Sequence, residues 1–113
     1  MSEPLAGRRC KPCEGGMPPL TPAEAARLLG QLSGAWSLSE EARAISRKFA
    51  FRDFYRTMSF VNALAHIANV EDHHPDLEVG YNYCRVTFTT HAVGGLSEND
   101  FVCAAKVDLI PIN

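Results

Sequence analysis

The chain has 113 residues, of which 46% are hydrophobic and 21% are charged, as in an ordinary globular domain. Its formal net charge of −2 and pI near 6.0 argue against a broad nucleic-acid-binding surface, and no apolar run approaches the roughly 18 residues that span a bilayer. The N-terminus has no segment that resembles a signal peptide, so we expect a cytoplasmic protein that binds neither nucleic acid nor membrane and keeps its four cysteines as thiols.

The beginning of the chain differs in composition from the rest. It is rich in Gly, Pro and charged side chains, which predicts a flexible N-terminal arm over residues 1–20 and a single domain over residues 21–113. Within the arm, Cys10-x-x-Cys13 offers one pair of zinc ligands, but no second pair follows at the spacing of structural zinc sites. We therefore expect no metal site.

Capping residues and hydrophobic periodicity predict the elements of the domain. Thr21 is a good N-cap with Glu24 at the capping-box position, Asp53 can cap a long helix, and Ser97 can cap a last one. The expected order is a helix from residue 22 to about residue 33, a short strand near 37–38, a strand over 44–51, a helix over 54–70, two strands within 76–92 and a helix from residue 98. This order predicts an α+β fold, with a small antiparallel sheet of about four strands and helices packed on one face.

The long helix expected over residues 54–70 has apolar residues on more than one face. Phe54, Met58 and Val61 recur at helical spacing, and a second set that includes Phe60 does so as well. A helix with this pattern is usually buried on two sides. We therefore expect the second side to be a subunit interface.

The segment EDHHPD, at residues 71–76, places two histidines among three carboxylates and a proline. His73 and His74 cannot share one face of a strand, and on a helix their side chains diverge by roughly 100°. Pro75 fixes its own φ and disfavours the helical region for His74, so the chain is expected to turn there. The two histidines should then point in different directions.

His91 and Asp100 are further candidates for an acid–base site. His91 is expected at the end of a strand and Asp100 near the start of the last helix, and such element ends are common positions for catalytic groups. Because imidazole titrates near pH 6.5, one histidine can be acid and another base while a carboxylate fixes a tautomer. The alternative to an acid–base role is that Asp100 only caps its helix and that His91 and His66 are surface residues. Cys84 and Cys103 occupy core-like positions and need no reactive role.

The segment EDHHPDLEVGYNYCRVTFTTHAVGGLSENDF closely resembles the pterin-4a-carbinolamine dehydratase family. The resemblance extends from about Leu20 to Val107 and includes Trp36, and the CKPCEGG arm is similar to that of bacterial members. Its signature residues are Asp72, His73, His74, Pro75, Tyr81, Thr90, His91, Gly95, Leu96, Ser97, Glu98 and Asp100. The motif is long and its gaps match, so the resemblance is specific.

This chain departs from the family pattern at two positions. Family members often have an acidic residue four positions before the first motif histidine, where this chain has Asn69. Glu71 is near, but it is expected on a different face of the helix. Leu77 stands where animal members often have a bulky aromatic residue, which is expected to soften stacking on the pterin. Whether Asn69 weakens the site is left open by the sequence.

The resemblance implies a dehydratase that converts 4a-hydroxytetrahydropterin to quinonoid dihydropterin and water. Such an enzyme recycles the pterin of aromatic amino acid hydroxylases and needs no metal or other cofactor. The resemblance implies His73 and His91 as an acid–base pair, with His74 orienting the pterin. The candidate catalytic residues are therefore His73, His74, His91 and Asp100. The candidate substrate-binding residues are Asp72, His73, His74, Pro75, Thr89, Thr90 and His91.

The same resemblance supplies an alternative. Animal members also bind the dimerisation helix of a transcription factor, and some bacterial relatives resemble assembly factors, so the chain can be a non-enzymatic interaction module on the same fold. The retained His73, His74 and His91 argue against this alternative. A third hypothesis, a metal-dependent hydrolase, predicts bound zinc or iron. The family's dimers and tetramers agree with a two-sided helix, so we expect a homodimer or homotetramer.

Overall fold

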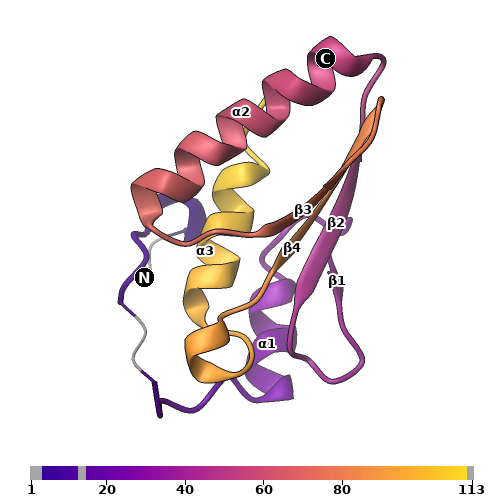
Figure 1. Ribbon diagram of the computed structural model, residues 1–113. Helices are drawn as coiled ribbons and strands as arrows, with labels where there is room; N and C mark the ends of the chain where they lie inside the picture. Colours follow the sequence, from indigo (N-terminus) through magenta and orange to yellow (C-terminus); the bar gives the residue numbers. More distant parts are fainter. Residues whose placement is uncertain (1–3, 13–14, 112–113) are drawn as a thin grey trace.

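The computed structural model describes residues 4–12 and 15–111, and its helices cover one face of a sheet (Figure 1). The elements, in chain order, are η1 (Leu5–Gly7), α1 (Pro22–Leu29), β1 (Ser37–Leu38), β2 (Ile45–Ala50), α2 (Phe54–Glu71), β3 (Asp76–Val79), β4 (Tyr83–Phe88), η2 (His91–Val93) and α3 (Glu98–Val107). This arrangement confirms the predicted α+β fold. In the described part of the chain, no helix combines the length and apolar character that crossing a membrane requires.

The sheet has four strands in the order β1-β2-β4-β3, and each neighbouring pair is antiparallel. β2 and β4 lie at the centre and pair along their whole lengths. Alternate side chains of β4 are buried, as the sequence alternation predicts; they are Cys84, Val86 and Phe88. All residues of the edge strand β3 are exposed. The core therefore lies between the two central strands and the helices.

Aromatic side chains fill the space between the sheet and the helices. The ring centroid of Phe49 in β2 lies 4.5 Å from that of Phe60 in α2 and 6.2 Å from that of Trp36. The indole N–H of Trp36 donates to the carboxylate of Asp108 at 2.9 Å, and Arg47 donates to the same carboxylate at 2.7 Å. These contacts join the turn before β1, the strand β2 and the residue that follows α3.

Both ends of α2 are defined by specific backbone contacts. The carboxylate of the N-cap, Asp53, accepts a hydrogen bond from a backbone N–H of the first turn at 2.9 Å, as predicted. At the other end, Asp72 adopts a left-handed conformation with φ 52°, and the N–H of His73 donates to the carbonyl of Ala68 at 3.1 Å. This contact reverses the chain before Pro75. Asp72, not the proline, therefore ends the helix.

Two other element ends differ from the sequence predictions. α1 ends at Leu29, one turn earlier than expected, because Gly30 follows and glycine has a low helix propensity. β4 ends at Phe88, where its partner β2 has its first residue, Ile45. His91 is therefore not at the end of a strand but begins η2.

The first described residues pack against the domain. Leu5 is only 3% exposed and belongs to the hydrophobic core, with η1 lying against α3. The backbone N–H of Cys10 donates to the carboxylate of Glu71 at 2.8 Å, and Arg9 forms an ion pair with the same carboxylate. Residues 4–12 of the predicted arm thus make specific contacts with the domain, and residues 1–3 and 13–14 of that arm lie outside the described residues. A buried leucine and a buried carboxylate, each contacted over a long sequence distance, hold them in place.

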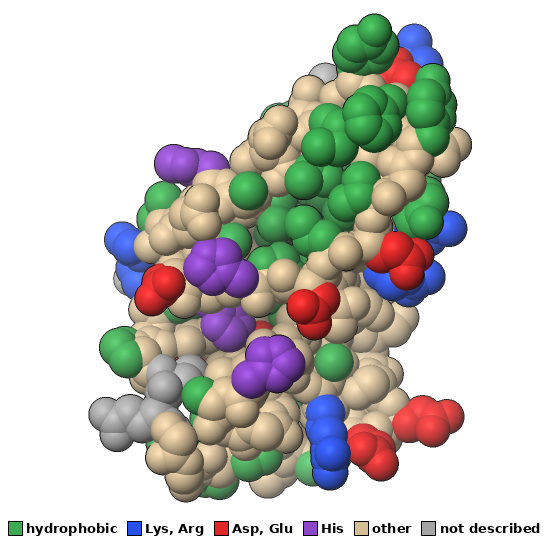
Figure 2. Space-filling model, viewed as in Figure 1, with side chains coloured by type: hydrophobic (Ala, Val, Ile, Leu, Met, Phe, Trp, Pro, Cys, Tyr) green, Lys and Arg blue, Asp and Glu red, His purple; other side chains and the backbone are tan. Residues whose placement is uncertain are grey.

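An exposed apolar surface lies at the opposite end of the molecule from α1, between the start of α2 and the strands β3 and β4 (Figure 2). The exposed fraction is 84% for Tyr55 and 67% for Tyr81. We name this surface the apolar face; its residues are Phe54, Tyr55, Leu77, Val79 and Tyr81. Of the helix residues that carry the predicted apolar pattern, Phe54 lies on this face.

Candidate active site

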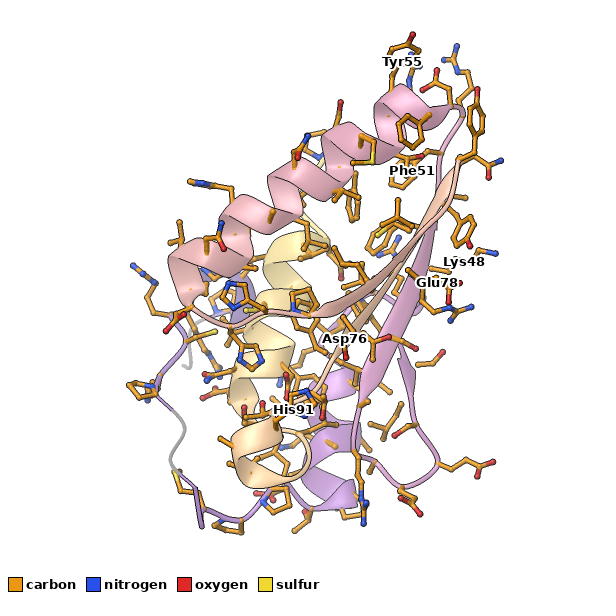
Figure 3. The ribbon with its side chains drawn as sticks, in the orientation of Figure 1. Lys48, Phe51, Tyr55, Asp76, Glu78 and His91 are labelled. Carbon is orange, nitrogen blue, oxygen red and sulfur yellow. The ribbon has the colours of Figure 1, made fainter. Side chains whose placement is uncertain are left out.

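A hollow of about 460 Å³ lies where the end of α2, the end of β4 and the start of α3 meet. Histidine side chains gather on this face of the molecule (Figure 2), and His91 lies at its lower edge, on the loop that leads from β4 to α3 (Figure 3). The lining residues are Lys11, Pro12, Asp72, His73, His74, Thr89, Thr90, His91, Ala92 and Asn99. The fold thus brings together three histidines from two separate segments.

A larger hollow, of about 510 Å³, lies beside the start of α2. Its described lining includes Phe51, Tyr55 and Phe60 but no histidine, carboxylate or cysteine. It offers apolar contact without a group that titrates near neutral pH. We therefore place the candidate chemistry in the hollow that contains the histidines.

His73 lies at the floor of this hollow. Its side chain is 12% exposed, and its ring stacks on Phe88 with centroids 6.0 Å apart and planes 8° from parallel. Nε2 of His73 lies 2.6 Å from Oδ1 of Asp100, whose side chain is fully buried. Because an ionised carboxylate can only accept, it favours the tautomer with hydrogen on Nε2. Nδ1 is then the ring nitrogen left for a ligand.

Asp100 uses its second carboxylate oxygen to hold the start of α3. The hydroxyl of Thr90 donates to Oδ2 at 2.7 Å, and the backbone N–H of the N-cap Ser97 donates to it at 3.0 Å. The positive end of the helix dipole lies here and favours negative charge. Asp100 therefore caps α3, as the alternative in the sequence analysis expected, and is also the hydrogen-bond partner of His73.

His74 is exposed and also lines the hollow. Its Nε2 lies 3.0 Å from Oδ1 of Asn69, on the last turn of α2. An amide oxygen thus occupies the place where the resemblance leads one to expect a carboxylate, and it accepts the hydrogen bond without adding charge. Glu71 does not replace that carboxylate, because it is buried and bonded to the backbone of Cys10.

His91 is the least constrained of the three histidines. It begins η2, a single turn that ends at Gly94 with φ 72°, a conformation that glycine adopts readily. The base of the turn is closed by the backbone N–H of Thr90, which donates to the carbonyl of Gly95 at 2.8 Å. The side chain of His91 is exposed and forms no hydrogen bond within the described residues.

The remaining predicted binding residues divide into three groups. Asp72 lines the hollow and is exposed. Thr89 and Thr90 also line it, but their hydroxyls already donate, to the carbonyl of Arg43 at 2.6 Å and to Asp100 respectively. Pro75 is not part of the lining. The two threonines are therefore better placed to shape the site than to offer free hydroxyl donors.

The sequence analysis missed a wall of the hollow that the N-terminal arm supplies. The side chain of Asn99 makes a two-way contact with the backbone of Lys11: its amide donates to the carbonyl at 2.6 Å, and its oxygen accepts from the N–H at 2.9 Å. This contact holds Lys11 and Pro12 at the rim. The partners are 88 residues apart, so no local pattern indicates it.

Glu71 anchors the arm behind this wall. Burial raises the pKa of its carboxyl, but the hydrogen bond from the N–H of Cys10 and the charges of Lys106 and Arg9 outweigh burial, so the pKa lies below its usual value of 4.5. The Nε atom of Arg9 is 3.0 Å from the carboxylate. The ionised form of Glu71 is therefore the one that the folded chain favours.

The described cysteines, Cys10, Cys84 and Cys103, are free thiols in the structure. Cys84 and Cys103 are fully buried, which agrees with their core-like positions. Cys13, the second half of the C-x-x-C pair, lies outside the described residues. Within residues 4–12 and 15–111, no group of three or more His, Cys, Asp or Glu side chains is arranged to hold a metal ion.

Comparison with known proteins gives a consistent result. Residues 18–110 match the model of the family described as "Pterin 4 alpha carbinolamine dehydratase". A protein of Nitrosomonas eutropha is 61% identical over 109 residues, covering 96% of this chain and 95% of its own length. One of Legionella pneumophila (strain Corby) is 52% identical over 113 residues and the whole of both chains. Both are named "Putative pterin-4-alpha-carbinolamine dehydratase".

Solved structures extend the comparison. A "transcriptional coactivator/pterin dehydratase" from Brucella melitensis has a TM-score of 0.75 and 34% identity, over 80% of this chain and 95% of its own. A pterin dehydratase-like protein described as a RuBisCO assembly factor in the alpha-carboxysome has a TM-score of 0.57 and 25% identity, over 66% of this chain and 86% of its own. Because the family model matches residues 18–110 and the relatives match over nearly their full length, this chain belongs to the pterin 4 alpha carbinolamine dehydratase family.

Proposed function

We propose that this chain is a dehydratase that converts 4a-hydroxytetrahydropterin to quinonoid dihydropterin and water. The observation that carries the proposal is the 2.6 Å contact between His73 and the buried Asp100, at the floor of a hollow that His74 and His91 also line. Membership of the family supports the class of substrate. A cytoplasmic location of the protein and its functional link to an aromatic amino acid hydroxylase remain predictions from the sequence.

Dehydration needs two proton transfers. Hydroxide is a poor leaving group, so an acid must donate a proton to the 4a oxygen as the carbon–oxygen bond breaks, and a base must accept the proton that the ring nitrogen loses. We assign the base to His73, because Asp100 supports the imidazolium that forms when Nδ1 accepts a proton. We assign the acid to His91, whose exposed imidazole exchanges protons with solvent. Each positioned transfer is worth roughly 10²- to 10⁴-fold in rate.

His74 is proposed to bind and orient the pterin. Its Nε2 is occupied by Asn69, which fixes the ring and leaves Nδ1 for a ligand. Asp72 and the backbone near His91 are proposed to contact the amide-like edge of the pterin, and Thr89 and Thr90 to shape that wall. This division makes His74 and Asp72 residues of binding, and His73 and His91 residues of proton transfer.

The direct test is stopped-flow measurement of the dehydration of freshly generated 4a-carbinolamine. The wild-type chain should accelerate the reaction far above the spontaneous rate, and a His73→Ala, His91→Ala double variant should lose at least about 10²-fold. His66→Ala is the matched control, because His66 is an exposed histidine of α2 outside the hollow. A double variant that dehydrates as fast as the wild type would refute the proposed chemistry.

We also infer a homodimer or homotetramer in which the apolar face is covered by a second copy. The exposed aromatic side chains of this face support the inference, because large apolar patches are usually buried in assemblies. Sedimentation of the wild type should give an oligomer at micromolar concentration, and Tyr81→Asp, which places a charge within the face, should shift it toward monomer. A monomeric wild type would contradict this inference.

The second candidate function is an interaction module without catalysis. It is supported by the described roles of the two structural relatives and by the exposed apolar face. The stopped-flow assay separates the two functions. A folded wild-type chain that leaves the spontaneous dehydration rate unchanged would favour the interaction module.

A further inference from the structure

Two thiols outside the candidate chemistry lie in contact. The Sγ atoms of Cys10 and Cys103 are 3.4 Å apart, although the residues are separated by 93 positions in the chain. Cys10 lies on the N-terminal arm and is partly exposed, whereas Cys103 lies in α3 and is fully buried. A partly exposed thiol is thus paired with a buried one across the seam between arm and domain.

The arm is fastened on both sides of Cys10. Its own N–H is held by Glu71 at 2.8 Å, and the backbone of the next residue, Lys11, is held by Asn99. The Sγ atom of Cys10 also lies 3.7 Å from the backbone carbonyl of Asn99 in α3. These contacts keep the two sulfurs together, and closing a bond of about 2.05 Å needs only a small further approach.

We propose that Cys10 and Cys103 form an oxidisable dithiol, at which a low-molecular-weight disulfide such as oxidised glutathione links the arm covalently to α3. In an intracellular protein such a bond is expected to be reversible and redox-sensing, since the glutathione pool reduces it again. Nothing in this proposal depends on the dehydratase activity.

The oxidation proceeds by two thiol–disulfide exchanges. The Cys10 thiolate attacks one sulfur of the small disulfide, forms a mixed disulfide and releases one thiol. Cys103 then attacks the Sγ atom of Cys10, its proton leaving with the second released thiol. In sum, two protein thiols and one small disulfide become one protein disulfide and two small thiols.

The surroundings set the order of these steps. The hydrogen bond with Cys10 and burial raise the pKa of the Cys103 thiol, so Cys103 is a poor first nucleophile. Once Cys10 is in the mixed disulfide, that hydrogen bond can no longer hold the proton on Cys103. Cys84 is the contrasting case: burial raises its pKa to about 11, and it lies fully buried in the central strand β4.

The test is to incubate the full-length, fully reduced chain with oxidised glutathione, block remaining thiols, and map cross-linked peptides by mass spectrometry. Cys10 and Cys13 stay on one tryptic peptide, because trypsin does not cut between Lys11 and Pro12. The decisive sample is therefore Cys13→Ser, in which we expect a Cys10–Cys103 cross-link as in the wild type. Cys84→Ser, the matched control, should cross-link equally well.

Cys10→Ser should abolish the cross-link, and this partly exposed position makes the variant safer for folding than one at Cys103. Thermal unfolding gives a second readout. Because the bond closes a loop of about the whole domain, oxidation should raise Tm by roughly 5–15 °C in Cys13→Ser and not in Cys10→Ser. The proposal is overturned if Cys13→Ser stays reduced or stops at mixed disulfides, or if wild-type oxidation joins only Cys10 to Cys13.

Discussion

The two sides of the candidate site are positioned in different ways. On one side, His73 is largely buried, stacked on Phe88 and bonded to Asp100, which in turn starts α3. On the other side, His91 is exposed on the single turn η2, and its side chain forms no hydrogen bond within the described residues. The core thus orients the imidazole of His73, whereas no side-chain hydrogen bond within the described residues orients that of His91.

Because the two sides are positioned differently, we expect substitutions on them to affect stability and activity differently. Substitutions on the buried side disturb both, because the same contacts hold the fold and the imidazole. Substitutions on the exposed side should change activity alone, because exposed positions away from special contacts rarely alter stability by more than about 0.5 kcal/mol. Each of the following variants tests whether that separation holds.

The largest effect is expected at Asp100. Asp100→Ala removes the acceptor for His73, Thr90 and Ser97 at once, and it should lower the free energy of unfolding by about 2–4 kcal/mol and abolish most dehydration. Urea denaturation and the stopped-flow assay measure the two losses. Unchanged urea stability would show that the buried side is not held through this carboxylate.

Asp100→Asn is the matched variant that separates the two losses. An amide oxygen can still accept from Ser97 and Thr90, so most of the stability should remain. The amide nitrogen would then face Nε2 of His73 as a donor and favour the other tautomer, which should reduce kcat by roughly 10²- to 10⁴-fold. Equal losses of stability in the Ala and Asn variants would count against this role.

His73→Gln and His91→Gln compare the two sides directly. Both should reduce kcat by roughly 10²-fold or more. His73→Gln should also destabilise the chain by about 1–2 kcal/mol, because it removes the ring stacked on Phe88 and the partner of a buried carboxylate. His91→Gln should leave the urea midpoint unchanged. A larger stability loss at His91 than at His73 would reverse the comparison.

Glu71 tests the buried side through pH. Its folded-state pKa lies below the usual 4.5, so its ionised form stabilises the fold at neutral pH, and this contribution is lost as the pH falls below that value toward the folded-state pKa. Glu71→Gln should therefore lower the free energy of unfolding by about 1–2 kcal/mol at pH 7. The difference from wild type should shrink below about pH 4. A pH-independent difference would exclude this linkage.

The smallest effect is expected at Asn69. Asn69→Ala frees the ring of the exposed His74 and should raise KM by about 3- to 10-fold, the equivalent of one neutral hydrogen bond, with little change in kcat or stability. Steady-state kinetics across pterin concentrations measure the split. A kcat effect equal to that of His91→Gln would move His74 from binding to proton transfer.

Local signals predicted most of the fold. The Asp53 cap and the Thr21–Glu24 capping box depend on residues within one turn, and the buried alternation of β4 depends on a period of two. The end of α2 was predicted to within one residue, but the left-handed conformation of Asp72 that ends the helix was not, because sequence patterns give little notice that an aspartate will adopt it.

Contacts between distant segments could not be predicted from local sequence patterns. Asn99 and Lys11 are separated by 88 positions in the chain, and Cys10 and Cys103 by 93. They meet in a structure in which Leu5 enters the core and Glu71 binds the backbone of Cys10. Composition describes the arm as a Gly- and Pro-rich segment and gives no sign that Leu5 is buried in the core. The EDHHPD segment and the position of His91 indicated the histidines, and the family resemblance gave their expected roles, whereas the atoms that they contact required the fold.

One carboxylate oxygen of Asp100 contacts His73 and the other holds the start of α3, and this double role has a consequence for which residues can change during evolution. A descendant that had lost its catalytic function would still need Asp100 and Thr90, because their hydrogen bonds hold the N-terminus of α3. His91 would be under no such demand and would be replaced first. In relatives that have a different function, an aspartate at the position of Asp100 can therefore be kept for folding alone. The residue at the position of His91 says more about whether a relative catalyses the reaction.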